Sequence, residues 1–286
     1  MSAAPEISSI TIREINELAE MRAVEELQKE IWGVPDLDVV PYTHLVAAKE
    51  AGGVLIGAFD GETCVGFVYG FPSFERGQMA HHSHMLAVKS AYRNYDLGRR
   101  LKLAQREHVI AQGIDLISWT FDPLQSLNAH FNFGKLGVLA DRYFVNFYGE
   151  DAASFLHQTG TDRLWVSWLV SSERVQGLID GGSYQVSSNH GTPLVQVEAD
   201  DSSRRNDLAE GLSWDQAAIE IPSNIDALPR EMGLRWREDT RWAFTEALKA
   251  GYFVDAFVRE TRGDKRIGKY ILSHKKAQKA QKKDFE

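Results

Sequence analysis

The sequence contains a single cysteine, Cys64, and no run of apolar residues long enough to cross a bilayer. One cysteine excludes an intramolecular disulfide, and a membrane helix would need about 18 consecutive apolar residues. The N-terminus has no basic segment followed by an apolar one, which argues against a secretory signal. We therefore expect a protein of the reducing cytoplasm.

Basic charge and two common catalytic motifs are also scarce. Forty acidic side chains against 32 basic ones leave a net charge of -8, which disfavours broad binding to nucleic acid or an anionic membrane. The chain has neither a Gly-x-Ser-x-Gly elbow nor a Gly-x4-Gly-Lys-Ser/Thr phosphate loop. A hydrolase with a nucleophile elbow and a P-loop enzyme are therefore disfavoured.

Hydrophobic residues make up 43% of the 286 positions, enough for one large domain or two small ones. In the first 171 residues, apolar alternation and helical spacing follow one another repeatedly. Strands are expected at 9–14, 54–59, 64–69, 82–88, 114–121, 139–148 and 164–170, and helices at 18–31, from 41, after 98 and at 124–136. This order predicts an α/β (α+β) domain over residues 1–171, with a sheet that carries helices on both faces.

The rest of the chain is less regular. Residues 177–188 and 200–207 are polar or rich in glycine and serine and predict an irregular link. Beyond it we expect a strand at 217–221, a helical turn at 224–228, a helix at 234–250 and a hairpin of 253–258 with 267–272. Residues 172–272 thus form a C-terminal α+β part of unknown role, and residues 273–286 form a lysine-rich, solvated tail.

The most informative segment runs from His82 to Val88 and continues through Arg93 and Asp96 to Gly98, where a helix begins. It resembles the coenzyme A loop of the GNAT acyltransferase superfamily, to which Val88, Arg93 and Gly98 correspond. The order of elements over residues 11–171 resembles that fold as well, which implies a mixed, mostly antiparallel sheet. The phrases HSHMLAV, LKLAQRE and GIDLISWTFDPL are similar to a less-studied branch of predicted acetyl- and succinyltransferases, some associated with N-succinylamino acid metabolism.

The resemblance implies an acyl-CoA co-substrate, acetyl-CoA or succinyl-CoA, and no metal. The pantetheine arm would pair with the backbone of Leu86, Ala87 and Val88, and the amide of Asn128 would assist. Residues that would face or bind the pyrophosphate are Arg93, Asn94, Tyr95, Asp96, Leu97, Gly98 and Arg99. A helix N-terminus suits this task because its free N–H groups and dipole attract anions.

Two positions depart from the family pattern. Asp96 stands where the first glycine of the motif is usual, and its carboxylate would compete with phosphate unless it simply caps its own helix. Phe133 stands where a tyrosine usually protonates the departing thiolate. Tyr148 and Tyr143 are candidates for that role. Each can also be an ordinary strand residue with an apolar ring and a solvated hydroxyl.

An amine nucleophile needs a base, and His82 with His84 are the candidates because residues two apart share a strand face. His81 points to the opposite face, so at most two imidazoles could share a metal, and no third ligand is marked by spacing. A purely structural role for the histidines stays open.

We expect an N-acyltransferase that acts on the amine of a small molecule, with an amino acid among the candidates, and a homodimer is compatible with the sequence. Arg237 and Arg241 lie on one helix face and could grip a carboxylate, or form an exposed basic face. The alternative is a non-catalytic protein of the same fold that binds a ligand or partner. Acetylation of a protein N-terminus is a third hypothesis.

Overall fold

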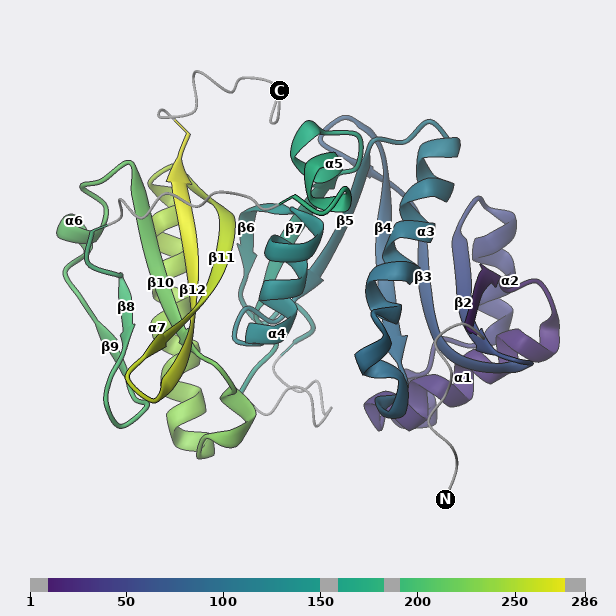
Figure 1. Ribbon diagram of the computed structural model, residues 1–286, viewed down its shortest axis with the longest axis horizontal. Helices are drawn as coiled ribbons and strands as arrows, with labels where there is room; N and C mark the ends of the chain where they lie inside the picture. Colours follow the sequence, from purple (N-terminus) through teal and green to yellow (C-terminus); the bar gives the residue numbers. More distant parts are fainter. Residues whose placement is uncertain (1–9, 150–158, 183–190, 276–286) are drawn as a thin grey trace. The chain divides into compact units, whose positions relative to one another are not determined.

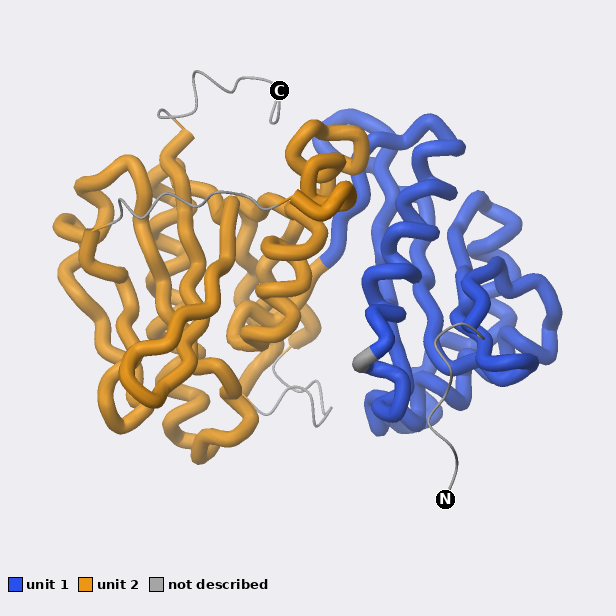
Figure 2. The backbone as a smooth tube through the Cα atoms, in the orientation of Figure 1, with its two compact units in different colours: residues 1–119, 154–156 blue, residues 120–153, 157–286 orange. Residues whose placement is uncertain are grey.

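The computed structural model describes residues 10–149, 159–182 and 191–275. They fall into two compact units, the first ending at Trp119 and the second beginning at Thr120 (Figure 2). No helix in these ranges is long and apolar enough to cross a membrane. The domain limits expected at 171 and 272 stay predictions, and the predicted tail falls almost wholly outside the described residues.

The first unit alternates strands and helices around one sheet (Figure 1). Its elements are β1 (Ile10–Glu14), α1 (Leu18–Trp32), η2 (Asp36–Asp38), α2 (Tyr42–Glu50), β2 (Val54–Asp60), β3 (Thr63–Glu75), β4 (Gln78–Val88), η3 (Ser90–Tyr95), α3 (Leu97–Ala111) and β5 (Leu116–Phe121). The strand order is β1-β2-β3-β4-β5. Neighbours are antiparallel except β4 and β5, which run parallel.

Helices cover both faces of this sheet, as the sequence predicts. The apolar stripe of α1, which includes Met21, Val24 and Leu27, packs with Tyr69 of β3 and Met85 of β4 in one buried cluster. The other face meets α3, where Gln105 contacts Ser83 of β4. A Cβ at Gly70 of β3 would collide with His81 and with Gln105, so only glycine lets α3 lie this close.

The second unit contains a longer sheet and a 20-residue helix. Its elements are α4 (Ser126–Ala129), η4 (His130–Leu136), β6 (Leu139–Phe144), β7 (Arg163–Leu169), α5 (Glu173–Ile179), β8 (Val195–Val197), β9 (Ser203–Arg205), α6 (Leu208–Gly211), β10 (Gln216–Pro222), η6 (Ile225–Ala227), α7 (Arg230–Lys249), β11 (Tyr252–Arg262) and β12 (Lys265–His274). The strand order is β7-β6-β11-β12-β10-β8-β9. Of the described pairs in this unit, β8 with β10 is the parallel one.

The predicted fold class is confirmed, because both units are mixed sheets with mostly antiparallel pairs and the C-terminal part is α+β. Three local predictions are wrong. The strand expected to reach Tyr148 ends at Phe144, where a turn begins. The stretches 177–188 and 200–207 are not wholly irregular, because α5 extends into the first and β9 lies in the second. A contact that a local pattern does not show joins β9 to α7, where the Ser203 hydroxyl donates to Asp239.

Candidate functional site

The candidate site lies on β4, where this strand parts from β5. Parallel pairing joins His81 to Ile117 and His82 to Ser118, and the described register goes no further. The other edge of β4 stays paired with β3 as far as Val88. Beyond Ser83, one backbone edge of β4 is thus free of β5, which leaves main-chain donors and acceptors for an extended ligand.

A β-bulge at His84 shapes the strand at the same place. Tyr69 pairs with Met85 and Gly70 with Ser83, so His84 is the extra residue. His82 and His84 lie on one face, with ring centroids 6.2 Å apart. Phe71 packs against both imidazoles, at 5.4 Å from His82 and 5.7 Å from His84.

The surroundings of these two imidazoles disfavour their charged forms. Burial first, and the neighbouring His84 and Lys102 next, lower the pKa of His82 to about 4. Desolvation and the nearby His44 also lower the pKa of His84. Both rings are therefore neutral at pH 7 and have a free lone pair for a proton, but a pKa of about 4 makes His82 a weaker base than an ordinary histidine.

His81 points to the opposite face of β4, into a buried polar cluster under α3. Gln105 Nε2 lies 3.1 Å from His81 Nε2, and the Ser83 hydroxyl donates to Gln105 Oε1 at 2.9 Å. Lys102 donates to Ser83 at 2.8 Å and lies 3.7 Å above the ring of Trp119. Burial lowers the pKa of His81 to about 3 and that of Lys102 well below its usual value. This histidine contributes to packing and is turned away from the face that His82 and His84 share.

The predicted pyrophosphate cradle lies between η3 and α3. Asp96 has a left-handed backbone, with φ of 55°, which explains why glycine is usual at this position. Its side chain makes no capping hydrogen bond to α3. The carboxylate is 62% exposed and lies 3.8 Å from Arg99. The amides at the start of α3 are therefore not filled by this side chain and fit an anionic ligand, whereas the exposed Asp96 carboxylate would repel it.

The other predicted coenzyme A residues divide between the two units. Leu86, Ala87 and Val88 lie on the β4 segment that is free of β5, and Arg93 is exposed on η3. Tyr95 closes η3, and the backbone of Asn94 lies in the same turn, while Leu97 is buried and Gly98 follows it in α3. Asn128 is exposed on α4 of the second unit. The roles of all these residues stay predictions.

The candidates for the acid and the position where the acid is usual also lie in the second unit. The Tyr143 hydroxyl donates to Asp162 at 2.7 Å. Tyr148 is 49% exposed in the turn after β6, with its ring against Phe147. Phe133 is 1% exposed and packs edge-on against Phe121 and Tyr270. Phe133 is thus a core aromatic, and a role for Tyr148 stays a prediction.

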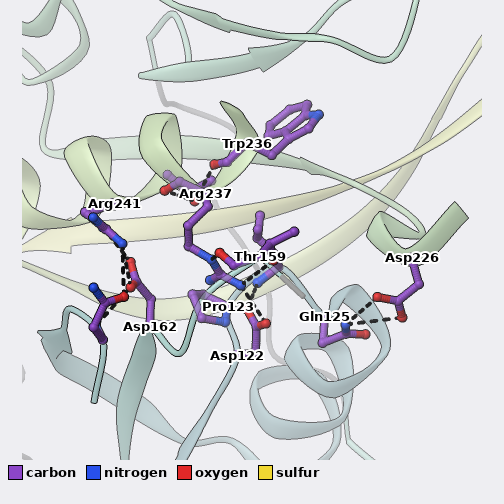
Figure 3. A network of polar contacts seen from close by, with 12 residues as sticks. Asp122, Pro123, Gln125, Thr159, Asp162, Asp226, Trp236, Arg237 and Arg241 are labelled. Carbon is purple, nitrogen blue, oxygen red and sulfur yellow. Dashed lines mark hydrogen bonds and ion pairs between the residues drawn. The ribbon is translucent and has the colours of Figure 1, made fainter. Parts of the chain in front are cut away.

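The two arginines expected to grip a carboxylate already hold carboxylates of this chain (Figure 3). Arg237 donates to Asp122 at 2.6 Å, and the two side chains are 2% and 8% exposed. Arg241 donates twice to Asp162, at 2.8 and 2.9 Å. Arg237 is therefore not part of an exposed basic face, and the carboxylate that each arginine holds belongs to this chain. Their pairing partners lie more than 70 residues away in the sequence, so helix spacing could not reveal them.

Two residues that the sequence analysis missed join the face of His84. His44 of α2 lies 3.0 Å from the Tyr69 hydroxyl, and the Tyr69 ring is edge-on to His84 at 6.1 Å. No motif marks them, but strand alternation does place Tyr69 and Phe71 on one face of β3. Among the described residues, no group of three side chains is arranged to hold a metal ion.

One family model matches part of the chain. Residues 18–137 match the model of the acetyltransferase (GNAT) family. No curated protein matches the chain. Among solved structures, it is similar to aminoglycoside 6'-acetyltransferase type Ii, with 20% identity and a TM-score of 0.46 over 57% of this chain and 99% of that one.

Two further solved structures cover the same share of the chain. The ribosomal-protein-S18-alanine N-acetyltransferase from Escherichia coli is 12% identical, with a TM-score of 0.46 over 57% of this chain and 95% of that one. An aminoglycoside 6'-N-acetyltransferase complexed with coenzyme A is 17% identical, with a TM-score of 0.43 over 57% of this chain and 98% of that one.

Proposed function

Since residues 18–137 belong to the acetyltransferase (GNAT) family, we propose that this protein moves an acyl group, acetyl or succinyl, from coenzyme A to the amine of a small molecule. The observation that carries the proposal is the free edge of β4 beyond His82, next to the open start of α3. An extended pantetheine arm would pair with Leu86 to Val88, and the pyrophosphate would meet the α3 amides. Arg93 and Arg99 would supply charge-assisted hydrogen bonds.

In this proposal His82 is the general base. The amine nitrogen attacks the thioester carbon, the C–N bond forms and the C–S bond breaks. The amine proton passes to His82 and from there to His84 and solvent. A bridging water carries it between the two rings, because their centroids are 6.2 Å apart. The thiolate leaves with its electron pair and takes a proton from solvent. A thiolate of ordinary pKa needs little help, so the Phe133 substitution is compatible with transfer.

The test is a steady-state transfer assay with acetyl-CoA and succinyl-CoA. His82→Ala should lower kcat by about 100-fold or more, the range that one proton-transferring side chain contributes, while coenzyme A affinity changes little. Met79→Ala, an exposed position on the same strand, is the matched control. Equal turnover in both variants would remove His82 from the mechanism.

The alternative function is a non-catalytic protein that uses this fold to bind a ligand, and Phe133 is the observation that favours it. Such a protein would bind a ligand, but the transfer assay would detect no coenzyme A released from acetyl-CoA or succinyl-CoA. The absence of a capping bond from Asp96 weakens this alternative, because its main support was a cradle closed by that side chain.

A further inference from the structure

A pocket of about 480 Å³ opens beside His84, wholly within the first unit. One wall comes from α2 and its C-terminal cap, with His44, Ala48 and Ala51. The other comes from β3, with Tyr69, Phe71 and Pro72. Its volume lies in the range of sites that hold small organic ligands, about 300 to 1,000 Å³.

The lining is aromatic and apolar. Phe71 and Tyr69 place their rings 5.7 and 6.1 Å from His84. Rings at such distances leave faces and edges that favour a further flat, apolar group. The pocket therefore suits an aromatic or alicyclic ligand.

The described residues that line the pocket include no Asp, Glu, Lys or Arg. A ligand carboxylate or a second ammonium group would lose its water there without gaining a partner of opposite charge. Such desolvation costs several kcal/mol.

One polar contact breaks the apolar lining. Burial raises the pKa of Tyr69 to about 12, so its hydroxyl stays neutral and can donate to His44 Nε2 across 3.0 Å. In that arrangement His44 carries its proton on Nδ1. The pair offers hydrogen bonds to an uncharged group and does not neutralise a charge.

We propose that this pocket binds the acceptor, and that the acceptor is an amine carried on an uncharged aromatic or alicyclic group, with no carboxylate and no second cation. The inference rests on the proposed function, because the amine of the ligand held in this pocket is the group that would receive the acyl group. It narrows the acceptor by excluding free amino acids and polycationic amines.

A matched pair of amines tests the substrate class. 2-Phenylethylamine and phenylalanine differ only in the carboxylate, so kcat/KM should be at least about 100-fold higher for 2-phenylethylamine, equivalent to roughly 2.7 kcal/mol. Equal or better use of phenylalanine, or of spermidine, would overturn the inference and leave the proposed acyl transfer intact.

Direct binding separates the two proposals. 2-Phenylethylamine is titrated into the protein with and without saturating coenzyme A. Ala51→Trp, which fills the pocket from an exposed position, should weaken binding at least tenfold. Ala47→Trp, exposed on the same helix but outside the pocket, should leave binding unchanged.

Binding that Ala51→Trp abolishes, without turnover of any amine, would support the pocket and refute the acyltransferase. Binding equal in the wild type and Ala51→Trp, or no binding under either condition, would overturn the pocket inference.

Discussion

Replacement of Arg237 by methionine should destabilise the second unit strongly. The guanidinium of Arg237 is 2% exposed and donates to Asp122 at 2.6 Å, and it also donates to the Thr159 carbonyl at 3.2 Å. Methionine keeps most of the volume but leaves the Asp122 carboxylate buried without its counter-charge. Removal of one partner of a buried pair costs about 3 to 5 kcal/mol.

Arg241→Met is the matched comparison on the same helix. Arg241 is 33% exposed, and Asp162 keeps hydrogen bonds from the Tyr143 hydroxyl at 2.7 Å and the Asn146 amide at 3.0 Å. The expected loss is therefore smaller, about 1.5 to 3 kcal/mol for charged hydrogen bonds.

Urea denaturation followed by tryptophan fluorescence measures both losses. The double variant Arg237→Met/Asp122→Asn should recover at least half of the Arg237→Met loss, because Asp122→Asn removes the carboxylate charge that Arg237→Met leaves unpaired. Unchanged stability of Arg237→Met together with a lost transfer activity would refute the reasoning and return Arg237 to a role in ligand binding.

Three further predictions concern the first unit. Burial lowers the pKa of His81 to about 3, so between about pH 6.5 and pH 3 this histidine is protonated in the unfolded chain but not in the folded one. Over that range it should lower the free energy of unfolding by about 1.4 kcal/mol for each unit that the pH falls. His81→Asn should remove that part of the slope in acid denaturation, and a slope identical to that of the wild type would contradict the prediction. Burial lowers the pKa of Lys102, so this lysine destabilises the folded state wherever the unfolded lysine is charged. Lys102→Met should therefore raise the melting temperature at pH 7, and the gain should shrink toward pH 10 as the unfolded lysine loses its proton. A gain that does not change with pH would show that Lys102 is charged in the folded state. Asp96→Gly should tighten coenzyme A binding about fivefold by removing a surface repulsion of roughly 1 kcal/mol, and weaker binding in calorimetry would place the pyrophosphate elsewhere.

The sequence predicts most elements of the first unit because each has a local signal. Asp60-Gly61 marks the β2–β3 hairpin, and the spacing of Met21, Val24 and Leu27 marks α1. The same alternation places His82 and His84 on one face. The bulge at His84 has no local signal, because it arises from a shift in pairing with β3.

The parts that sequence could not predict depend on contacts between distant segments. The pocket wall joins His44 of α2 to Tyr69 of β3, and no periodicity within either element relates them. Likewise, Arg237 is paired with Asp122, which lies 115 positions away in the sequence. Helical spacing is the same for a buried arginine and for an exposed one. The burial of Arg237 could therefore be found only from the folded structure.

The most direct test of the central claim is calorimetric titration of the protein with acetyl-CoA and succinyl-CoA. We expect a dissociation constant on the order of micromolar for one of them. Arg93→Ala should weaken this binding and Asp96→Gly should tighten it. No binding up to millimolar concentrations of either would contradict the claim that the free edge of β4 and the start of α3 form a coenzyme A site.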